Sequence, residues 1–280
     1  MNINWFPGHM KKTEGLIKEH LKLVDIVIEL VDARIPLASK NPLIDEIIRN
    51  KPRLLVFNKA DMADDRATEK WIEYYAKMGI KAVKTNAIEG KGFNEMYSAI
   101  NEVLKEKLDK YREKNLNFVI KMMVVGIPNV GKSSFINKIS KRSSAKTGDK
   151  PGITKSKQWI RISGQYELLD TPGILWHKFE DEETGKRLAY AGAIKDEILD
   201  VEELCYYLIG YLKNEYPDNL KERYKIEFTP DDDSFEIIEK IGKKRGFMIK
   251  GGEIDTFRTA NMILDEVRSL KLGKISFEKV

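Results

Sequence analysis

The stretch Met122–Ser134, MMVVGIPNVGKSS, decides the fold. A short apolar run is followed at once by Gly126–Ser133, which matches the pattern G-x-x-x-x-G-K-[ST], and a helical pattern continues through Ile139. A strand before this pattern and a helix after it are typical of a phosphate-binding P-loop. Its glycines let backbone N–H groups surround a phosphate, and the helix directs its positive N-terminus at the same anion. Lys132 is expected to reach the β- and γ-phosphates and the Ser133 hydroxyl to bind Mg²⁺. The expected nucleotide-binding residues of this loop are Asn129, Val130, Gly131, Lys132, Ser133 and Ser134.

Apolar runs of strand length alternate with helical patterns on both sides of this loop. We expect strands at 25–30, 53–57, 80–85 and 122–125, a hairpin of 159–162 with 166–169, and helices at 10–24, 43–49, 66–78, 92–113 and up to 139. Such alternation predicts an α/β domain with a mostly parallel sheet and helices on both faces. From about residue 180 only helical patterns remain, at 184–196, 200–214, 233–245 and 254–270. We therefore expect a P-loop domain over 1–179 and an all-α domain over 180–280.

Two later stretches would complete the phosphate and magnesium site. Asp170-Thr171-Pro172-Gly173 follows an apolar strand. In P-loop enzymes a carboxylate at this place approaches Mg²⁺, and a backbone N–H of the turn can sense the γ-phosphate, so Asp170 and Gly173 are candidate site residues. Upstream, Thr154 in a Pro-Gly-Ile-Thr loop can give its hydroxyl to Mg²⁺ when γ-phosphate is bound. That loop is a candidate nucleotide switch, with an ordinary surface loop as the alternative.

A candidate base-reading motif, Asn58-Lys59-Ala60-Asp61, directly follows the apolar run 53–57. Guanine presents two donors on one edge, N1–H and the N2 amino group, and a single carboxylate can accept both. Asp61 would therefore select guanine over adenine, while the Lys59 stem lies across the base. Thr85-Asn86-Ala87 follows another expected strand. It would supply a second base-contacting loop, in which a backbone N–H near Ala87 reaches guanine O6.

The order of these motifs is unusual. Most GTPases run from phosphate loop through switch threonine and DxxG to NKxD, whereas here NKAD and TNA come first. The parts are complete but circularly permuted, which a fold with neighbouring termini tolerates. One consequence is that the DTPG stretch leads directly into the expected helical domain. We therefore expect nucleotide state to act on that domain with little intervening structure.

The chain resembles the circularly permuted, YlqF-type GTPases of ribosome assembly, and within them the bacterial ribosome biogenesis GTPase A group. The resemblance rests on WFPGHM, VDARIPLASKNP, NKAD, GIPNVGKSS, TGDKPGIT and LLDTPGILW, and it covers nearly the whole chain. It implies binding and hydrolysis of GTP, a need for Mg²⁺, and a late maturation step of the large (50S) ribosomal subunit. The helical tail would then contact RNA. Asn86 departs from the serine that many GTPases carry there, which matters little because the useful donor is mainly backbone.

Two features of the resemblance concern hydrolysis. Ile174 follows DTPG, where many GTPases carry a glutamine that orients the attacking water, so we expect slow hydrolysis that the ribosomal subunit stimulates. His9, just after Pro7-Gly8, is the candidate catalytic replacement, because a neutral imidazole at a helix start can orient water. Packing or RNA contact is the alternative for this histidine. Asn129 corresponds to a residue that helps hold K⁺ in similar GTPases, with loop-turn preference as the alternative.

Composition narrows the remaining classes of protein. The chain has 280 residues, one cysteine and a net charge of +5. A single cysteine fits a reducing cytoplasm, and no secretory h-region or apolar run long enough to span a membrane occurs. We expect a cytoplasmic monomer without a membrane partner, which contacts rRNA and ribosomal proteins. Basic clusters at 138–161 and 243–245 are candidate RNA contacts or solvated surface. Alternatives are a P-loop ATPase or kinase, a GTPase of another process such as tRNA modification or membrane traffic, and a nucleotide-gated RNA-binding scaffold with negligible hydrolysis.

Overall fold

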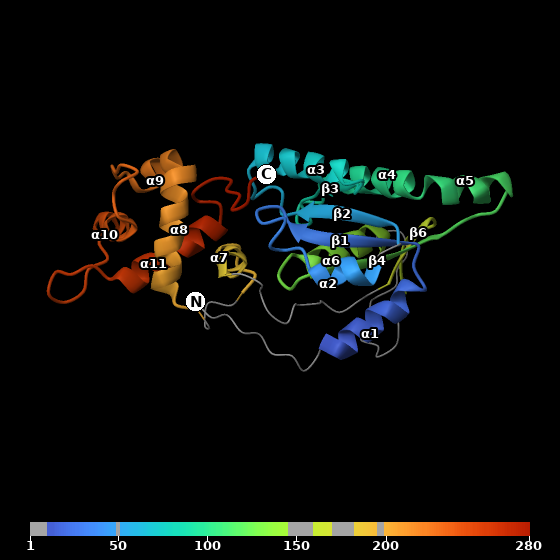
Figure 1. Cartoon of the computed structure of the whole chain (residues 1–280), viewed down its shortest axis with the longest axis horizontal. Helices are drawn as coiled ribbons and strands as arrows, with labels where there is room; N and C mark the ends of the chain where they lie inside the picture. The colour runs from blue at the N-terminus through green and yellow to red at the C-terminus, as the bar shows by residue number, and fades with distance from the viewer. Residues whose placement is uncertain (1–9, 49–50, 145–158, 170–181, 195–198) are drawn as a thin grey trace. The chain divides into compact units, whose positions relative to one another are not determined.

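The computed structural model describes residues 10–48, 51–144, 159–169, 182–194 and 199–280. These divide into two compact units. Residues 10–169 and 278–280 form the first, hereafter the nucleotide-binding unit, and 182–277 form the second, the helical unit (Figure 1). His9, Thr154, Asp170 and Gly173 lie outside the described residues, as does the predicted switch loop.

The nucleotide-binding unit is built on one six-stranded sheet with the order β3-β2-β1-β4-β6-β5. Its strands are β1 (Ile26–Asp32), β2 (Arg53–Asn58), β3 (Ala82–Lys84), β4 (Ile120–Gly126), β5 (Trp159–Ser163) and β6 (Tyr166–Leu169). Neighbouring strands pair in parallel except β5, which pairs antiparallel with β6 as the predicted hairpin. All seven residues of β1 are buried, as expected for a central parallel strand covered on both faces. The predicted, mostly parallel α/β fold is confirmed.

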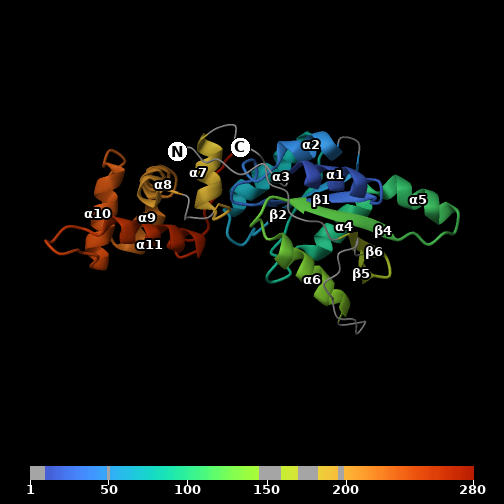
Figure 2. The same ribbon diagram turned by 90° about the horizontal axis from the view of Figure 1, so that it is seen from below.

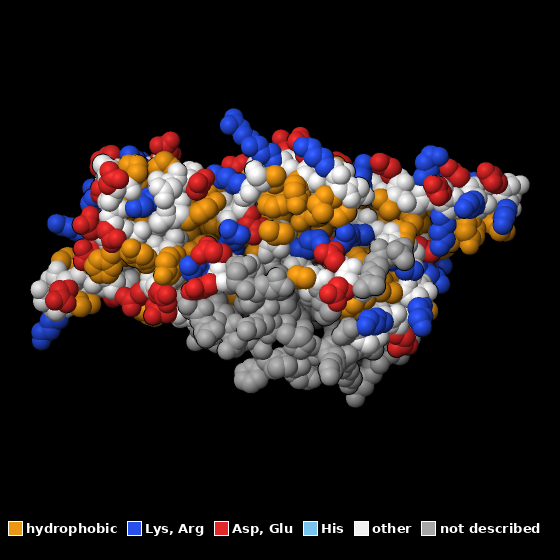
Figure 3. Space-filling view, viewed as in Figure 1, with side chains coloured by type: hydrophobic (Ala, Val, Ile, Leu, Met, Phe, Trp, Pro, Cys, Tyr) orange, Lys and Arg blue, Asp and Glu red, His pale blue; other side chains and the backbone are white. Residues whose placement is uncertain are grey.

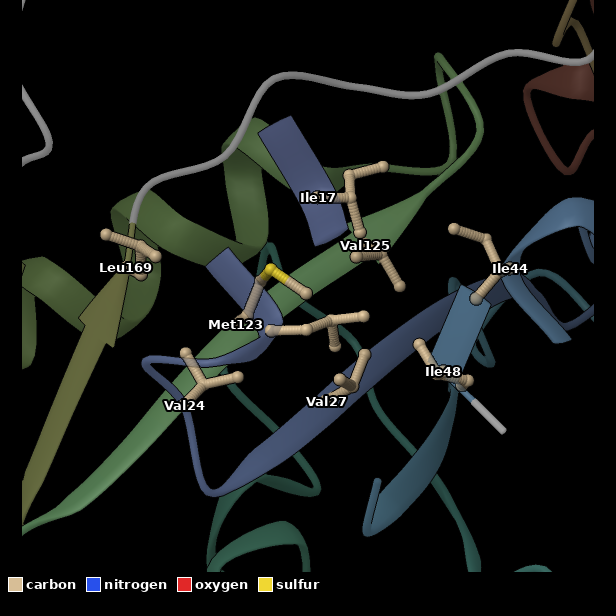
Figure 4. Close-up of a cluster of buried hydrophobic side chains, with 9 residues drawn as sticks. Ile17, Val24, Val27, Ile44, Ile48, Met123, Val125 and Leu169 are labelled. Carbon is tan, nitrogen blue, oxygen red and sulfur yellow. The ribbon is translucent and has the colours of Figure 1, made fainter. Parts of the chain in front are cut away.

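Helices cover both faces of this sheet (Figure 2). On one face lie α1 (Met10–Leu21), α2 (Pro42–Ile48) and α3 (Asp65–Lys77), and on the other α4 (Phe93–Val103) and α6 (Lys132–Ser144). Figure 4 shows how the first face is packed: Ile17 of α1 and Ile44 of α2 lie over Val27, Met123 and Val125 of the two central strands. This burial fixes the sheet and therefore the loops at its edge.

The helix expected over 92–113 is two helices, α4 and α5 (Lys105–Glu113), separated at Leu104. Leu104 has ψ near 11° and caps the end of α4 through its backbone N–H. Both halves continue the same apolar periodicity, so the pattern alone does not reveal the break. The prediction of one helix is therefore wrong in its continuity and correct in its helical content.

The helical unit contains α7 (Glu182–Tyr190), α8 (Val201–Glu215), α9 (Pro217–Tyr224), α10 (Ser234–Arg245) and α11 (Thr256–Arg268). Every regular element within 182–194 and 199–277 is a helix, as predicted. Helix α9 was not predicted. The helix expected at 184–196 already ends at Tyr190, and Gly192 follows with φ of 70°. Asp200, Asp233 and Asp255 cap the N-termini of α8, α10 and α11 through side-chain hydrogen bonds.

The last residues of the chain belong to the nucleotide-binding unit rather than to the helical unit. The Glu278 carboxylate accepts hydrogen bonds from the backbone N–H groups of Leu37 (2.5 Å) and Ala38 (2.9 Å). The Glu278 carbonyl accepts one from Trp71 Nε1 at 3.2 Å. The domain predicted over 180–280 therefore does not include its last residues in the structure. Glu278 holds the loop after β1 in place.

Strands β1, β2, β3 and β4 all end at one edge of the sheet because they run in parallel. Asn58 ends β2 at this edge, Thr85 follows β3, and Gly126 ends β4. In open α/β sheets, ligands bind beyond the carboxyl ends of the strands. The fold thus brings the predicted base-reading and phosphate-binding loops to the same edge.

Candidate functional site

Asn58 is the side chain that joins the three predicted nucleotide loops. It is buried, with 1% of its surface exposed. Its Nδ2 donates to the Val130 carbonyl of the P-loop at 2.9 Å. Its Oδ1 accepts from the Thr85 hydroxyl at 3.3 Å and from the Ala87 backbone N–H at 3.2 Å. One buried amide therefore fixes the distance between the base-reading and phosphate-binding loops.

Lys59 adds a second link between the same loops. Its Nζ donates to the Asn129 carbonyl of the P-loop at 2.7 Å. The same Nζ lies 3.0 Å from Asp32 Oδ2. Lys59 has φ of 57°, a conformation that is uncommon for residues other than glycine. The lysine is held at its backbone and at its amine, so its stem occupies a defined place beside the expected base.

Asp61 lies in a turn after Lys59. The Met62 N–H closes this turn by donating to the Lys59 carbonyl at 2.9 Å. The Asp61 side chain is half-buried, so the carboxylate is accessible to a base. The Asp61 charge also acts on Arg34. Burial by itself would lower the pKa of Arg34, but Asp32 and, more weakly, Asp61 raise it above its usual value. Arg34 therefore remains a cation beside Asp32.

The P-loop runs from Gly126, the last residue of β4, to Lys132, the first of α6. Gly131 has φ of 95°, and a Cβ there would lie 2.4 Å from Asn58 Nδ2. Glycine is therefore required at 131 for both backbone conformation and close approach. Asn129 also has a positive φ, of 60°, which asparagine tolerates better than most residues. This geometry gives Asn129 a conformational reason to be present, independent of any K⁺.

The start of α6 has the character of an anion site. Its first turn contains no acidic residue, and the Ser133 and Ser134 side chains are exposed. A helix N-terminus with free backbone N–H groups attracts phosphate. Val130, in contrast, is buried and contributes through its backbone. The loop is shaped to receive phosphates at the edge of the sheet.

The Thr85-Asn86-Ala87 loop is folded on itself. Asn86 Oδ1 accepts from the backbone N–H groups of Ile88 and Glu89, both at 3.0 Å. Asn86 is therefore a loop-shaping residue in this structure. The expected donor to guanine O6 is a backbone N–H near Ala87, and the N–H of Ala87 itself donates to Asn58 Oδ1 at 3.2 Å. Lys138 of α6 fixes the same loop by donating to the Ile88 carbonyl at 2.8 Å.

The sequence patterns did not single out Asp32 and Arg34 as site residues. Asp32 ends β1 and pairs in register with Asn58. Its carboxylate accepts from Arg34 at three positions, the backbone N–H (3.1 Å), Nε (3.0 Å) and Nη2 (2.8 Å). Burial alone would raise the pKa of Asp32, but Arg34 and Lys59 outweigh it and hold that pKa well below its usual range. The signal available in the sequence was their place directly after the apolar run that predicts a strand at 25–30.

Among the described residues, the structure brings together Asn58, Lys59, Asp61, Asn86, Ala87 and the P-loop residues 129–134. No group of three or more His, Cys, Asp or Glu side chains that could hold a metal occurs within the described part of the chain. No described helix is long and apolar enough to cross a membrane.

Comparison with known proteins agrees with this geometry. Residues 121–244 match the family described as 50S ribosome-binding GTPase, and residues 43–180 match the RsgA GTPase family. The ribosome biogenesis GTPase A of Bacillus cereus is 52% identical, over 99% of this chain and 94% of that protein. Its counterpart from Thermotoga maritima is 30% identical over the same shares, 99% and 94%.

Two solved structures share the fold. A GDP-bound YlqF has a TM-score of 0.68 and 26% identity, covering 94% of this chain and 98% of that one. A GNP-bound YlqF from Thermotoga maritima has a TM-score of 0.65 and 26% identity, covering 96% and 98%. The chain therefore belongs to the ribosome biogenesis GTPase A family of YlqF-type P-loop GTPases, enzymes of ribosome biogenesis that bind and hydrolyse GTP.

Proposed function

We propose that this GTPase acts on the large ribosomal subunit at a late step of its assembly, as a cytoplasmic monomer whose subunit binding depends on the bound nucleotide. The observation that carries the nucleotide-dependent part of the proposal is the Asn58 bridge between the expected guanine-reading and phosphate-binding loops. Support for the partner comes from the matched family, described as 50S ribosome-binding GTPases, and from relatives named for ribosome biogenesis.

In the proposed nucleotide site, Asp61 reads guanine, Asn58 and Lys59 hold the base loop, and the P-loop residues 129–134 bind the phosphates. Thr85-Asn86-Ala87 closes the base side. Exposed Ser133, in the first turn of α6, offers a hydroxyl oxygen, the kind of ligand Mg²⁺ prefers. Ser133, Thr154 and Asp170 would serve Mg²⁺, which neutralises phosphate charge when bound. Gly173 would sense the γ-phosphate through its backbone.

We further propose His9 as the residue that orients the attacking water, because Ile174 cannot do so. His9→Ala should lower subunit-stimulated turnover and leave GTP affinity unchanged. Equal turnover of the two proteins would assign His9 to packing or RNA contact. Asn129 as a K⁺ ligand predicts faster turnover in K⁺ than in Na⁺ at equal ionic strength. Equal rates in the two salts would refute this role for Asn129 and favour its positive φ as the reason for an asparagine there.

The helical unit offers a candidate RNA contact in the last turn of α10. Lys243 and Lys244 are exposed, and no described ion pair engages them. Arg245 differs, because it lies 3.4 Å from Glu266 and its guanidinium carbon is 5.4 Å from the centre of the Tyr224 ring. Two unengaged lysines on a helix end suit phosphate contacts. Arg245 is better explained by packing and ion pairing within the unit.

Lys146, Lys150, Lys155 and Lys157 of the other basic cluster, 138–161, lie outside the described residues. Lys138 donates to the Ile88 carbonyl, and Arg161 lies 3.7 Å from Glu167.

On α5, acidic and basic side chains alternate, as the right end of Figure 3 shows. Helix α5 therefore offers no surface of one charge for RNA.

The deciding experiment is co-sedimentation with purified large ribosomal subunits in a non-hydrolysable GTP analogue, in GDP, and without nucleotide. We expect more protein in the subunit pellet with the analogue, and GTP turnover stimulated by subunits. No association in any nucleotide state would refute the proposed partner. Lys243→Ala/Lys244→Ala should weaken association. It should also reduce the slope of log affinity against log salt concentration by roughly one per lysine. The matched control, Lys70→Ala/Lys77→Ala, removes two exposed lysines of α3 and should leave both quantities unchanged.

A further inference from the structure

The NKAD motif does not explain what holds the Lys59 side chain in one position. A lysine side chain is flexible, and its backbone φ of 57° is uncommon for this residue type. Its amine nevertheless has two oxygen partners, the Asn129 carbonyl at 2.7 Å and Asp32 Oδ2 at 3.0 Å. Only Asp32 carries a charge. The carboxylate is therefore the stronger of the two partners that fix the amine.

Asp32 is itself held rigidly. It is 3% exposed, and its carboxylate accepts three hydrogen bonds from Arg34. Its backbone N–H donates to the Ser39 hydroxyl at 2.9 Å, and the Ser39 hydroxyl donates to the Ile35 carbonyl at 2.6 Å. The loop after β1 therefore fixes the carboxylate before any ligand arrives. A fixed charge of this kind can preorganise a binding site.

We infer that Asp32 is a positioning residue of the nucleotide site: its buried carboxylate holds Lys59 between the guanine-reading loop and the P-loop. The sheet order supports this role, since β1 lies between β2, which leads to NKAD, and β4, which leads to the P-loop. The inference rests on the proposed assignment of Lys59 and Asn129 to the nucleotide site. A purely structural role for the Asp32–Arg34 pair is the competing explanation.

A double-mutant cycle on the full chain separates the two explanations. GDP affinity is measured by fluorescence titration for the wild type, Asp32→Asn, Lys59→Met and the double variant. If Asp32 acts through Lys59, Asp32→Asn should weaken GDP binding roughly ten- to a hundredfold, as expected for losing a hydrogen bond to a charged group. In the Lys59→Met background the same change should alter affinity by no more than about twofold, the usual error of additivity. Glu69→Gln, which removes the exposed partner of Lys84, is the control and should not change affinity.

Equal losses in both backgrounds would overturn the inference and leave Asp32 a structural residue. Asp32→Asn also removes the charge of the carboxylate that accepts three hydrogen bonds from the buried Arg34, which can unfold the protein. If circular dichroism shows such unfolding, Asp32→Glu replaces it in the same cycle, since it keeps the charge and displaces the carboxylate. The loss of GDP affinity caused by Asp32→Glu must again be absent in the Lys59→Met background. Failure of the wild type to prefer GDP over ADP would instead refute the proposed nucleotide site itself.

Discussion

Glu29 is a buried acid whose charge should weaken the nucleotide-binding unit at neutral pH. It lies mid-strand in β1, 1% exposed, between Val27 and Val31, which belong to two apolar clusters on the same face of the sheet. Arg53 Nη1 approaches Glu29 Oε2 at 3.4 Å, and Oε1 has no hydrogen-bond partner among the described residues. Burial raises the Glu29 pKa from 4.5 to about 7, although Lys40 and Arg53 oppose the rise.

The sign of the effect follows from proton binding. Between pH 4.5 and about 7 the folded protein keeps a proton on Glu29 that the unfolded chain has released. Stability conferred by the raised pKa is therefore complete below pH 4.5 and lost as pH rises to about 7. The rise of the Glu29 pKa from 4.5 to about 7 corresponds to roughly 3 kcal/mol of free energy. Glu29→Gln, which is neutral at every pH, should raise the free energy of unfolding by up to about 3 kcal/mol above pH 7 relative to the wild type.

The assay is urea unfolding without nucleotide, followed by circular dichroism at pH 5 and pH 8. Glu29→Gln should gain stability over the wild type at pH 8 and little at pH 5. Arg53 retains Asp45 as its partner, so the substitution does not leave it unpaired. Glu69→Gln, at an exposed ion pair, should show no such pH dependence. A difference between Glu29→Gln and wild type that is the same at both pH values would refute the reasoning.

Three further substitutions test the site and its supports. Asn58→Ala removes three hydrogen bonds between loops and should lower both GDP affinity, by titration, and the free energy of unfolding, by about 2–4 kcal/mol; unchanged values would refute the bridge. Asp61→Asn should shift preference from GDP to xanthosine diphosphate in competition titrations, because the amide can donate to the oxygen that replaces the guanine amino group; retained preference for GDP would contradict the proposed base contact. Glu278→Ala leaves the Leu37 and Ala38 N–H groups without their acceptor. It should lower the thermal midpoint, because the free energy of unfolding falls by about 1–3 kcal/mol; an unchanged midpoint would show that the Glu278 contacts do not stabilise the protein.

The strands and the motif loops that follow them were predictable because both are local. The apolar runs before NKAD and the P-loop have the length of buried strands. In the structure the first is β2 and the second is β4. The partners of Asn58 follow from the parallel arrangement that those strands imply. Helix α9 was missed although Pro217 stands at its first position, a recognised helix-start signal. Its eight residues are too few for apolar periodicity to be distinctive.

Other features depend on residues far apart in the chain. The Glu278 carboxylate binds a loop some 240 positions earlier, and no pattern around Glu278 indicates this contact. Asp32 and Arg34 are two residues apart, yet their meaning depends on Lys59, which only the sheet brings near. A backbone N–H near Ala87 was predicted to reach guanine O6, and only the structure shows that the N–H of Ala87 itself donates to Asn58 Oδ1. Local sequence identified the loops, and tertiary contacts decided which of their groups remain available.

The permuted motif order leaves the site intact because strand order in space, rather than order along the chain, assembles it. Strand β1 lies between β2 and β4, so Asp32 ends beside both the NKAD loop and the P-loop. A permutation changes which strands are joined and leaves these neighbours in place. It does alter the connection after β6, the strand that precedes DTPG in sequence, since the next described element is α7 of the helical unit. The arrangement therefore keeps Asp32, the NKAD loop and the P-loop together through β1, β2 and β4, whatever the order in which the chain joins these strands.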